Sequence, residues 1–370
     1  MSKRFYIFLS IICGVVSSIA IFLYWNKISP AAEAQIFTDT ILSVKEIQGA
    51  TTSVRLPLEN SIPSSTLSLL AVGDIMLDRS VMLKTQSAGD YNHPFLLIDP
   101  LFQQYDLHVA NLEGPITDNK SIANGTGGAR FTFTFSPKFV DPLKSRFQFL
   151  SLANNHEENF GQKGIAQTRK FLDDARVHFF GDPNNKQGFI SVTSSYHGIT
   201  LGFIGYHQLV ETGFENILAE IKKLDPEVDV LIAMPHWGIE YVTSTASYLQ
   251  KKEGHEMIDA GVDIIVGAHP HVIEPIEIYK DKVIFYSLGN FVFDQYFSEE
   301  TQTGLAIGMK MNKVNGTLQI EYNLIPLSIS GQSQVSVANP QKTERTLKFL
   351  SETSKVSKEQ KEKILQGSFH

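Results

Sequence analysis

The chain has 370 residues, of which 42% are hydrophobic and 19% charged, with 32 basic and 39 acidic side chains. These values are typical of a globular protein and exclude a wholly disordered, collagen-like or multi-span membrane chain. The single cysteine, Cys13, excludes an internal disulfide framework and a thiolate-based zinc finger.

Charge is spread unevenly along the chain. Residues 66–340 carry 20 basic and 31 acidic side chains, a net charge of −11, whereas residues 1–65 carry +1 and residues 341–370 carry +3. Because an acidic body repels polyanions, we expect no nucleic-acid binding. An anionic substrate would need a local positive centre here, such as a bound metal ion.

The first 65 residues predict a cytoplasmic stub (1–4), a transmembrane anchor (5–25) and an extracytoplasmic linker (26–65). Residues 5–25 contain no charged side chain, and a helix of this length spans about 31 Å, the hydrocarbon thickness of a bilayer. Lys3 and Arg4 precede this stretch, which favours a cytoplasmic N-terminus and a domain outside the cytoplasm, at the cell membrane. A cleaved secretory signal is the alternative, but the stretch is longer than a signal core and no A-x-A site follows promptly.

From residue 66 onward, apolar runs alternate with amphipathic stretches. Continuous apolar runs predict strands that are buried on both faces, and the alternation predicts an α/β fold with helices outside the sheet. Asn315-Gly316 predicts a turn between two antiparallel strands over 304–325, and residues 336–370 predict a basic helical tail on the surface. The strand runs are 67–73, 107–112, 147–153, 199–206, 229–235, 263–268 and 283–293, and the helical stretches are 163–176, 214–224 and 247–260.

Polar side chains stand where several of these predicted strands end. Alone, each has an ordinary explanation, since Gly73-Asp74 could be a turn and His236 a buried core histidine. Ligands collect at the carboxyl ends of strands in open α/β sheets, so together the residues predict one site. Imidazole, carboxylate and amide oxygen suit Mn, Fe or Zn better than calcium. The strand-end residues are Asp74, Asn111, Glu113, Asn155, His156, His236, His269, His271 and Asn290.

Six motifs in a fixed order carry a family resemblance. They are GDIMLDR (73–79), ANLEGPI (110–116), SLANNH (151–156), HWGIEY (236–241), GAHPHV (267–272) and YSLGNFVF (286–293). The series resembles the bacterial capsule-synthesis family CapA, associated with poly-γ-glutamate biosynthesis and similar in fold and motif order to calcineurin-like metallophosphoesterases. The resemblance covers about residues 66–330, and it implies a four-layer α/β/β/α sandwich for a domain over 66–335.

The resemblance also implies roles for individual residues. One or two divalent ions, Mn, Fe or Zn, would be bound, with Glu113 as the bridging carboxylate and His156 as the acid acting on the leaving group. The first ion would be held by Asp74 and His271, and the second by Asn155, His236 and His269.

The sequence departs from the phosphoesterase pattern at three points. Met76 stands where a histidine is expected, and a thioether is a poor ligand for these metals. Glu113 replaces an aspartate, and Glu157 follows His156 where an aspartate is frequent. These changes leave open a mononuclear site that retains Glu113, Asn155, His236 and His269.

Three further residues, Arg79, Glu240 and Asn290, are candidate substrate contacts, although an Arg79–Glu240 surface pair is an equally good interpretation. We expect a membrane-anchored, extracytoplasmic protein of capsule or poly-γ-glutamate production with a metal-dependent hydrolase or transferase-like site. An anionic polymer or a phosphoester would be its substrate, and a membrane-bound polymer synthase its partner. The alternatives are a non-catalytic metal-binding assembly factor and a surface phosphodiesterase or nucleotidase.

Overall fold

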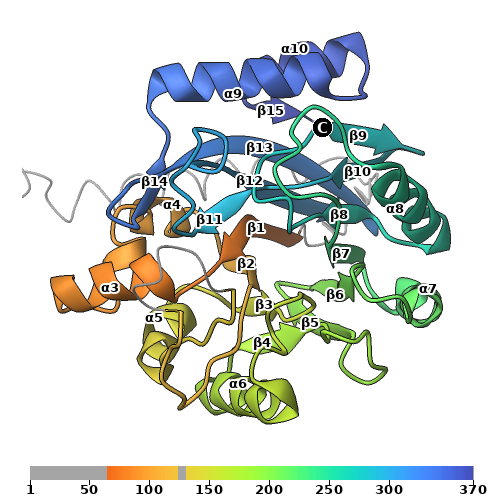
Figure 1. The fold of residues 1–370 in the computed structure, drawn as a ribbon. Coiled ribbons are helices and arrows are strands. Elements are labelled where there is room, and N and C mark those ends of the chain that lie inside the picture. Colours follow the sequence, from red (N-terminus) through yellow and green to blue (C-terminus); the bar gives the residue numbers. More distant parts are fainter. Residues whose placement is uncertain (1–64, 124–130, 370) are drawn as a thin grey trace, which may run out of the picture. The chain divides into compact units, whose positions relative to one another are not determined.

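The computed structural model describes residues 65–123 and 131–369, and their strands form two sheets (Figure 1). The larger sheet also contains β11 (Asn290–Val292), paired with β1, and β15 (Ser368–Phe369), paired with β13. Its main path is β14 (Val335–Val337), β13 (Thr317–Ile329), β12 (Thr303–Val314), β1 (Ser65–Ile75), β2 (Leu107–Leu112), β3 (Phe149–Ser151) and β4 (His178–Phe180). The smaller sheet runs β5 (Ser191–Tyr196), β6 (Ile199–His207), β7 (Val230–His236), β8 (Ile264–Val266), β10 (Lys282–Phe285) and β9 (Ile276–Tyr279).

The two sheets face each other across an apolar core. Alternate side chains of β1 and β12 pack against side chains of β6, β7 and β10 in one buried cluster, which includes Leu69, Ile307, Phe203, Ile232 and Phe285. Because successive strand residues point to opposite faces, the intervening residues of these strands point outward and require a second covering layer.

Helices supply that layer on each outer face. On the larger sheet, Leu70 and Ala110 pack with side chains of four helices, and on the smaller sheet Ile204 and Leu231 pack with those of two. The strands therefore bury both faces, which is why their sequences are continuous apolar runs. The four helices on the larger sheet are α3 (Arg79–Ala88), α4 (Asp99–Phe102), α5 (Val140–Lys144) and α6 (Gly161–Ala175). The two helices on the smaller sheet are α7 (Phe214–Leu224) and α8 (Tyr248–Ala260).

The predicted mixed α/β fold is confirmed, and the strand pair around Asn315-Gly316 is β12–β13. The apolar run 283–293 is not one strand, however. Residues 282–285 belong to the smaller sheet and residues 290–292 to the larger one. Gly289, at φ 67°, lies where the chain crosses between the sheets, in a conformation that glycine adopts without steric cost.

The C-terminal segment differs from the predicted surface tail. It forms two helices, α9 (Pro340–Thr353) and α10 (Lys358–Leu365), followed by β15, along the edge of the molecule beside β13 (Figure 1). Leu350, Ile364 and Phe369 are buried in the cluster between the sheets. The basic composition alone does not predict this burial in the core, because the lysines of an amphipathic helix cover its solvent face while the other face packs.

The predicted stub, anchor and nearly all of the linker lie outside the described residues. Within 65–123 and 131–369, no helix has the length and apolar character needed to span a bilayer.

Candidate metal centre

The implied ligands come together where strands of both sheets end. Asp74 at the end of β1 pairs in register with Asn111 of β2 and with Asn290 of β11. In the smaller sheet, His236 ends β7 and pairs with Ala268, directly before His269. The two groups of strand ends meet at one place, so residues separated by up to about two hundred positions in sequence share one site.

Gly73 allows the end of β1 to lie close to the segment that enters β11, its neighbour in the larger sheet. A Cβ atom at this position would lie 1.8 Å from the Gly289 carbonyl oxygen, far inside van der Waals contact. The Asp74 backbone N–H donates to that same oxygen, with N and O 3.2 Å apart. The glycine before Asp74 therefore serves the close packing that positions the aspartate.

Asp74, Glu113 and His271 form what we call the acidic corner of the site. All three are buried, and each offers a ligand atom within 4.8 Å of the others. Asp74 is well satisfied, since Asn111 Nδ2 donates to its Oδ1 at 2.7 Å and the His269 backbone N–H to its Oδ2 at 3.2 Å. Neither carboxylate oxygen of Glu113 has a hydrogen-bond partner among the described residues.

The neighbours of His271 determine which of its ring nitrogens carries a hydrogen. Asn290 uses its amide nitrogen to donate to Gln295 and to the Thr301 carbonyl, so its Oδ1 accepts from His271 Nδ1, 3.1 Å away. A neutral His271 then presents the lone pair of Nε2 to Glu113 Oε1 at 3.6 Å. Two acceptors face each other, an arrangement that requires a proton or a cation between them.

The acidic corner therefore fits a divalent cation. Two ligands about 2.1 Å from one ion lie about 3.0–3.5 Å apart, close to the separation of Glu113 and His271. Burial, and then the charge of Asp74, raise the pKa of the Glu113 carboxyl well above its usual range. A cation would reverse this penalty by pairing with the buried carboxylates, and this set of O and N donors suits Mn, Fe or Zn.

Asn155, His236 and His269 form an imidazole corner beside the first. His236 Nε2 lies 2.9 Å from Asn155 Oδ1 and 3.1 Å from His269 Nδ1. On the other side of the ring, Asn111 Nδ2 lies 3.2 Å from His236 Nδ1 and donates to it, which places the proton of neutral His236 on Nε2. Without a cation this corner is thus satisfied internally, and an ion bound there would displace that proton.

Both imidazoles of this corner are neutral at pH 7. Burial is the main cause, followed by neighbouring histidines, and together they lower the pKa of His236 well below its usual range and that of His269 to about 3. Neutral imidazole is the form that binds metal ions.

His156 lies at the rim of the acidic corner. Its Nε2 is 3.9 Å from Glu113 Oε1, and its Nδ1 is 3.2 Å from Asn159 Oδ1, which also accepts the Phe133 backbone N–H. Nδ1 therefore carries the proton, and the Nε2 lone pair faces the centre. Burial lowers the pKa of His156 to about 4, so at neutral pH this imidazole begins as a proton acceptor.

Asn111 has a role that the predicted ligand set omits. Besides donating to Asp74 and His236, it accepts a hydrogen bond from Asn154 Nδ2 at 3.1 Å. It therefore ties the acidic corner to the imidazole corner. The sequence does contain a signal for it, since Asn111 is a polar residue inside the apolar run 107–112.

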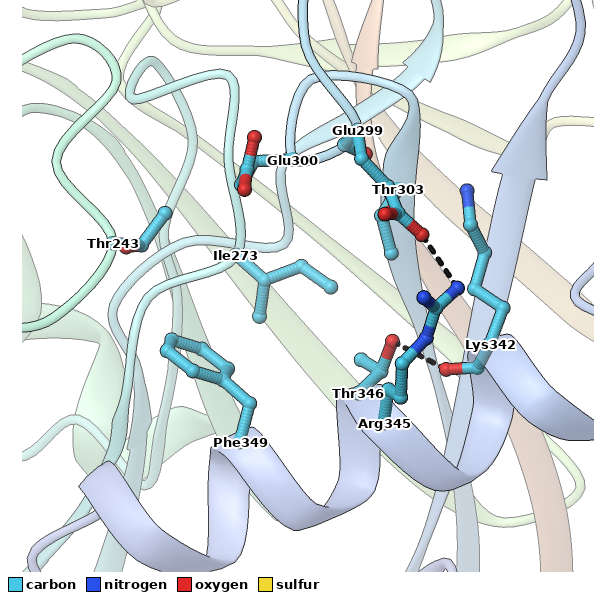
Figure 2. A pocket seen from close by; sticks show the side chains of 9 residues that line it. All are labelled: Thr243, Ile273, Glu299, Glu300, Thr303, Lys342, Arg345, Thr346 and Phe349. Atoms are coloured by element: carbon cyan, nitrogen blue, oxygen red, sulfur yellow. Dashed lines mark hydrogen bonds and ion pairs between the residues drawn. The ribbon is translucent and has the colours of Figure 1, made fainter.

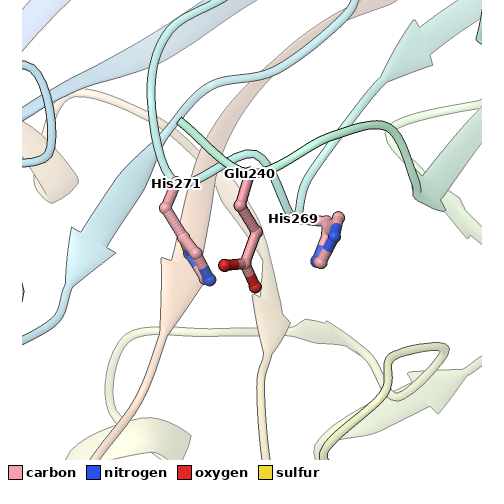
Figure 3. A group of neighbouring side chains, drawn as sticks. All are labelled: Glu240, His269 and His271. Carbon is pink, nitrogen blue, oxygen red and sulfur yellow. The ribbon is translucent and has the colours of Figure 1, made fainter. Parts of the chain in front are cut away.

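The three predicted substrate contacts have three different surroundings in the structure. Arg79 is buried and forms an ion pair with Asp294, so it is not paired with Glu240 as the alternative interpretation had it. Its guanidinium carbon also lies 4.9 Å from the centre of the Phe133 ring. Asn290 holds His271, as described above. Glu240 is exposed and lies beside His269 and His271 (Figure 3).

Met76 lies in the apolar cluster behind the larger sheet. Its sulfur accepts the backbone N–H of Asp78, with the two atoms 3.1 Å apart. The side chain thus contributes to packing and to the turn before α3.

Backbone strain is concentrated around the site. His269 (φ 97°), His271 (φ 59°) and Tyr241 (φ 63°) all adopt left-handed conformations without being glycine. Each such residue costs about 1–3 kcal/mol and persists only where surrounding contacts hold it. Here the Tyr241 backbone N–H donates to the Pro270 carbonyl at 2.9 Å, which joins the two loops.

A separate cavity of about 250 Å³ lies between α9 and the loops that follow Tyr241 and His271 (Figure 2). Thr243 and Ile273 line it on the loop side, and Lys342 and Arg345 on the helix side. Arg345 pairs with Glu299 across the opening. The nine lining residues include none of the predicted site residues, so the cavity is distinct from the metal centre.

Comparison with known proteins gives a family match and two clear relatives. The family model of bacterial capsule synthesis protein PGA_cap matches residues 68–295. The chain is 31% identical to the PGA biosynthesis protein CapA of Bacillus subtilis over 292 residues, which cover 73% of this chain and 74% of that protein. It is 29% identical to the capsule biosynthesis protein CapA of Bacillus anthracis over 310 residues, covering 78% and 74%.

Among solved structures, the chain is similar to the calcineurin-like phosphoesterase YfkN from Bacillus subtilis. The identity is 17% and the TM-score 0.42, with 82% of this chain and 99% of that chain covered. A likeness this distant carries no argument about activity.

Proposed function

This chain belongs to the bacterial capsule synthesis protein family PGA_cap, and on that premise we propose a metal-dependent role in making an anionic surface polymer. The protein would be anchored in the cell membrane by residues 5–25, with its domain outside the cytoplasm. Its substrate would be a poly-γ-glutamate chain or a phosphoester, and its fold the metallophosphoesterase-like α/β/β/α sandwich. A membrane-bound polymer synthase would be its partner.

The buried, unpartnered carboxylate of Glu113 is the observation that carries this proposal. An isolated carboxylate in an apolar interior costs several kcal/mol, and proteins pair such groups or use them to bind metals. Here the facing group is the lone pair of a histidine, so a cation is the natural complement. The same cation would offset the charge of the buried carboxylates, which would otherwise repel an anionic substrate.

Two groups of residues in this chain would each hold one metal ion. Asp74, Glu113 and His271 would hold one divalent ion, and Asn155 with His236 and His269 would hold a second where the His236 proton is displaced. When bound, such an ion polarises a carbonyl or phosphoryl oxygen and neutralises developing charge.

His156 would transfer a proton in this hydrolysis or group-transfer reaction. In its neutral form it would accept at Nε2 the proton of the attacking water or hydroxyl group, and afterwards return that proton to the leaving group. Asn159 keeps the ring oriented by accepting from Nδ1, so Nε2 continues to face the centre.

Metal content per chain tests the centre directly. We would measure it by elemental mass spectrometry on the full-length protein, purified in detergent, beside Glu113→Gln and His236→Ala variants. One equivalent that is lost in Glu113→Gln supports occupation of the acidic corner alone. Two equivalents, with one lost in His236→Ala, support both corners. No metal after reconstitution with Mn, Fe and Zn would overturn the proposal.

Turnover tests the chemistry. The His156→Ala variant should retain metal yet lose hydrolysis or transfer of a phosphodiester or γ-glutamyl substrate by about 10²–10⁴-fold. Equal turnover by the variant and the parent would remove His156 from the reaction.

A non-catalytic metal-binding assembly factor is the second candidate. It is favoured by Met76, whose side chain packs in the core and leaves the acidic corner with a single imidazole. If the protein is such an assembly factor, it would bind metal and polymer production would depend on the bound metal. The His156→Ala substitution would then leave polymer production unchanged.

A further inference from the structure

Glu240 is the exposed member of a second group of possible ligands. One of its carboxylate oxygens lies within 4.8 Å of a ring nitrogen of His269 and of one of His271. Figure 3 shows its carboxylate between the two imidazole rings, reaching them from a different loop. His271 also belongs to the acidic corner and His269 to the imidazole corner, so Glu240 reaches a residue of each.

The loop that carries Glu240 is held in this position from both ends. On its N-terminal side, Gly238 is at φ 91° and its N–H donates to Gln208 Oε1 at 2.9 Å. On its C-terminal side, the Tyr241 N–H donates to the Pro270 carbonyl, and Gln295 Nε2 donates to the Tyr241 hydroxyl at 3.1 Å. These contacts hold the backbone around Glu240 beside the 269–271 loop, and the Tyr241 side chain also contacts the Glu240 carboxylate.

The electrostatics of this placement are unfavourable unless a cation is present. Glu240 adds a third carboxylate to a site that already holds the buried Asp74 and Glu113, because the two groups of possible ligands share His271. Three carboxylates and one divalent ion sum to a charge of −1, whereas three carboxylates and two divalent ions sum to +1. An anionic substrate is attracted only in the second case.

We propose that Glu240 is a ligand of the metal centre, supplied from the solvent side and reaching the ion between His269 and His271. The other implied ligands are buried or partly buried on strand ends, whereas Glu240 is exposed on a loop. It is therefore the ligand that an incoming anionic substrate can displace without unfolding the site. This inference rests on the proposed metal centre and assigns to Glu240 a role at the ion in place of direct substrate contact.

Binding of Mn²⁺ alone tests this assignment without any substrate. The full-length protein, purified in detergent and stripped with a chelator, would be titrated with Mn²⁺ by calorimetry. Glu240→Gln should weaken Mn²⁺ binding at least about tenfold, since even the loss of an outer-shell partner costs about 10–100-fold. Glu240→Asp, which keeps a carboxylate on a shorter side chain, should bind more tightly than Glu240→Gln.

Two controls separate the possible failures. Glu211→Gln removes the same charge from another exposed loop and should leave Mn²⁺ affinity within about twofold. If Glu240→Gln binds Mn²⁺ as the parent does while Glu113→Gln does not, the inference is overturned and the metal centre stands. If the parent itself binds no Mn²⁺, the proposed function fails first.

Folding is checked by the thermal midpoint of the metal-free protein. Because Glu240 is exposed and its charge is unfavourable without a cation, its replacement should not lower that midpoint. A lowered midpoint in Glu240→Gln would indicate a structural role for the side chain and would overturn the inference.

Discussion

Asn111 donates a hydrogen bond to Asp74, with Nδ2 and Oδ1 2.7 Å apart and both side chains buried. The second amide hydrogen points to His236 Nδ1 at 3.2 Å. One amide thus orients a carboxylate from the larger sheet and an imidazole from the smaller sheet. This is the role of an outer-shell partner, which fixes the direction of a ligand without binding the ion itself.

Replacing this amide should therefore weaken metal binding while the ligands remain. We expect Asn111→Ala to lower Mn²⁺ affinity by about 10–100-fold, measured by calorimetry on the chelator-stripped protein. Asn119→Ala, at an exposed position, is the matched control and should bind as the parent does. Identical affinities for the two variants would show that Asn111 only packs.

Glu274 should make stability depend on pH. Burial raises its pKa from 4.5 to about 8, although Gln250 Nε2 donates to Oε2 at 2.6 Å. Between these pH values the folded chain holds a proton that the unfolded chain has released. Stability therefore falls as pH rises through this window, by up to about 1.4 kcal/mol per pH unit.

Glu274→Gln replaces the ionisable carboxyl with a neutral amide. The free energy of unfolding of this variant should therefore decline less between pH 4.5 and 8 than that of the parent. Urea unfolding of both proteins at several pH values measures the difference. Parallel pH profiles would mean that Glu274 ionises without cost in the folded state.

Gly73→Ala should disrupt the close packing between the end of β1 and the segment that enters β11. The added methyl group would meet the Gly289 carbonyl oxygen at 1.8 Å, and overpacking of this kind costs about 1–3 kcal/mol or more. Because Asp74 follows directly, Mn²⁺ affinity should fall together with the unfolding midpoint. Gly331→Ala, where a Cβ meets no atom within 4 Å, should change neither, and equal behaviour of the two variants would contradict the packing argument.

The C-terminal helices should contribute to stability as part of the core. Leu350 in α9 is fully buried, whereas Leu365 at the end of α10 is 51% exposed. We expect Leu350→Ala to lower the free energy of unfolding by about 2–5 kcal/mol and Leu365→Ala by less than about 0.5 kcal/mol, both measured by urea unfolding. A small effect at Leu350 would restore the interpretation of a surface tail.

Prediction from the sequence worked best where one local pattern decides the structure. The apolar runs become strands, and residues 214–224 form α7 as predicted. The sequence does not predict the short strands β4, β5 and β9, because their residues are few or polar and strand formation there depends on pairing with a neighbouring strand. The run 283–293 predicts one strand, because hydrophobicity does not distinguish residues of one sheet from residues of the other.

The sequence by itself determined the mixed α/β class, the family, and the residues that stand at the strand ends. Those properties follow from periodicity and from motifs that are contiguous in the chain. Only the tertiary structure decided which of these residues meet. It places Asp74 and His271 around the unpartnered carboxylate of Glu113, pairs Arg79 with Asp294, and brings Glu240 to His269 and His271. These contacts depend on how two sheets pack and on backbone conformations that the packing must hold, and neither property is carried by any single stretch of the sequence.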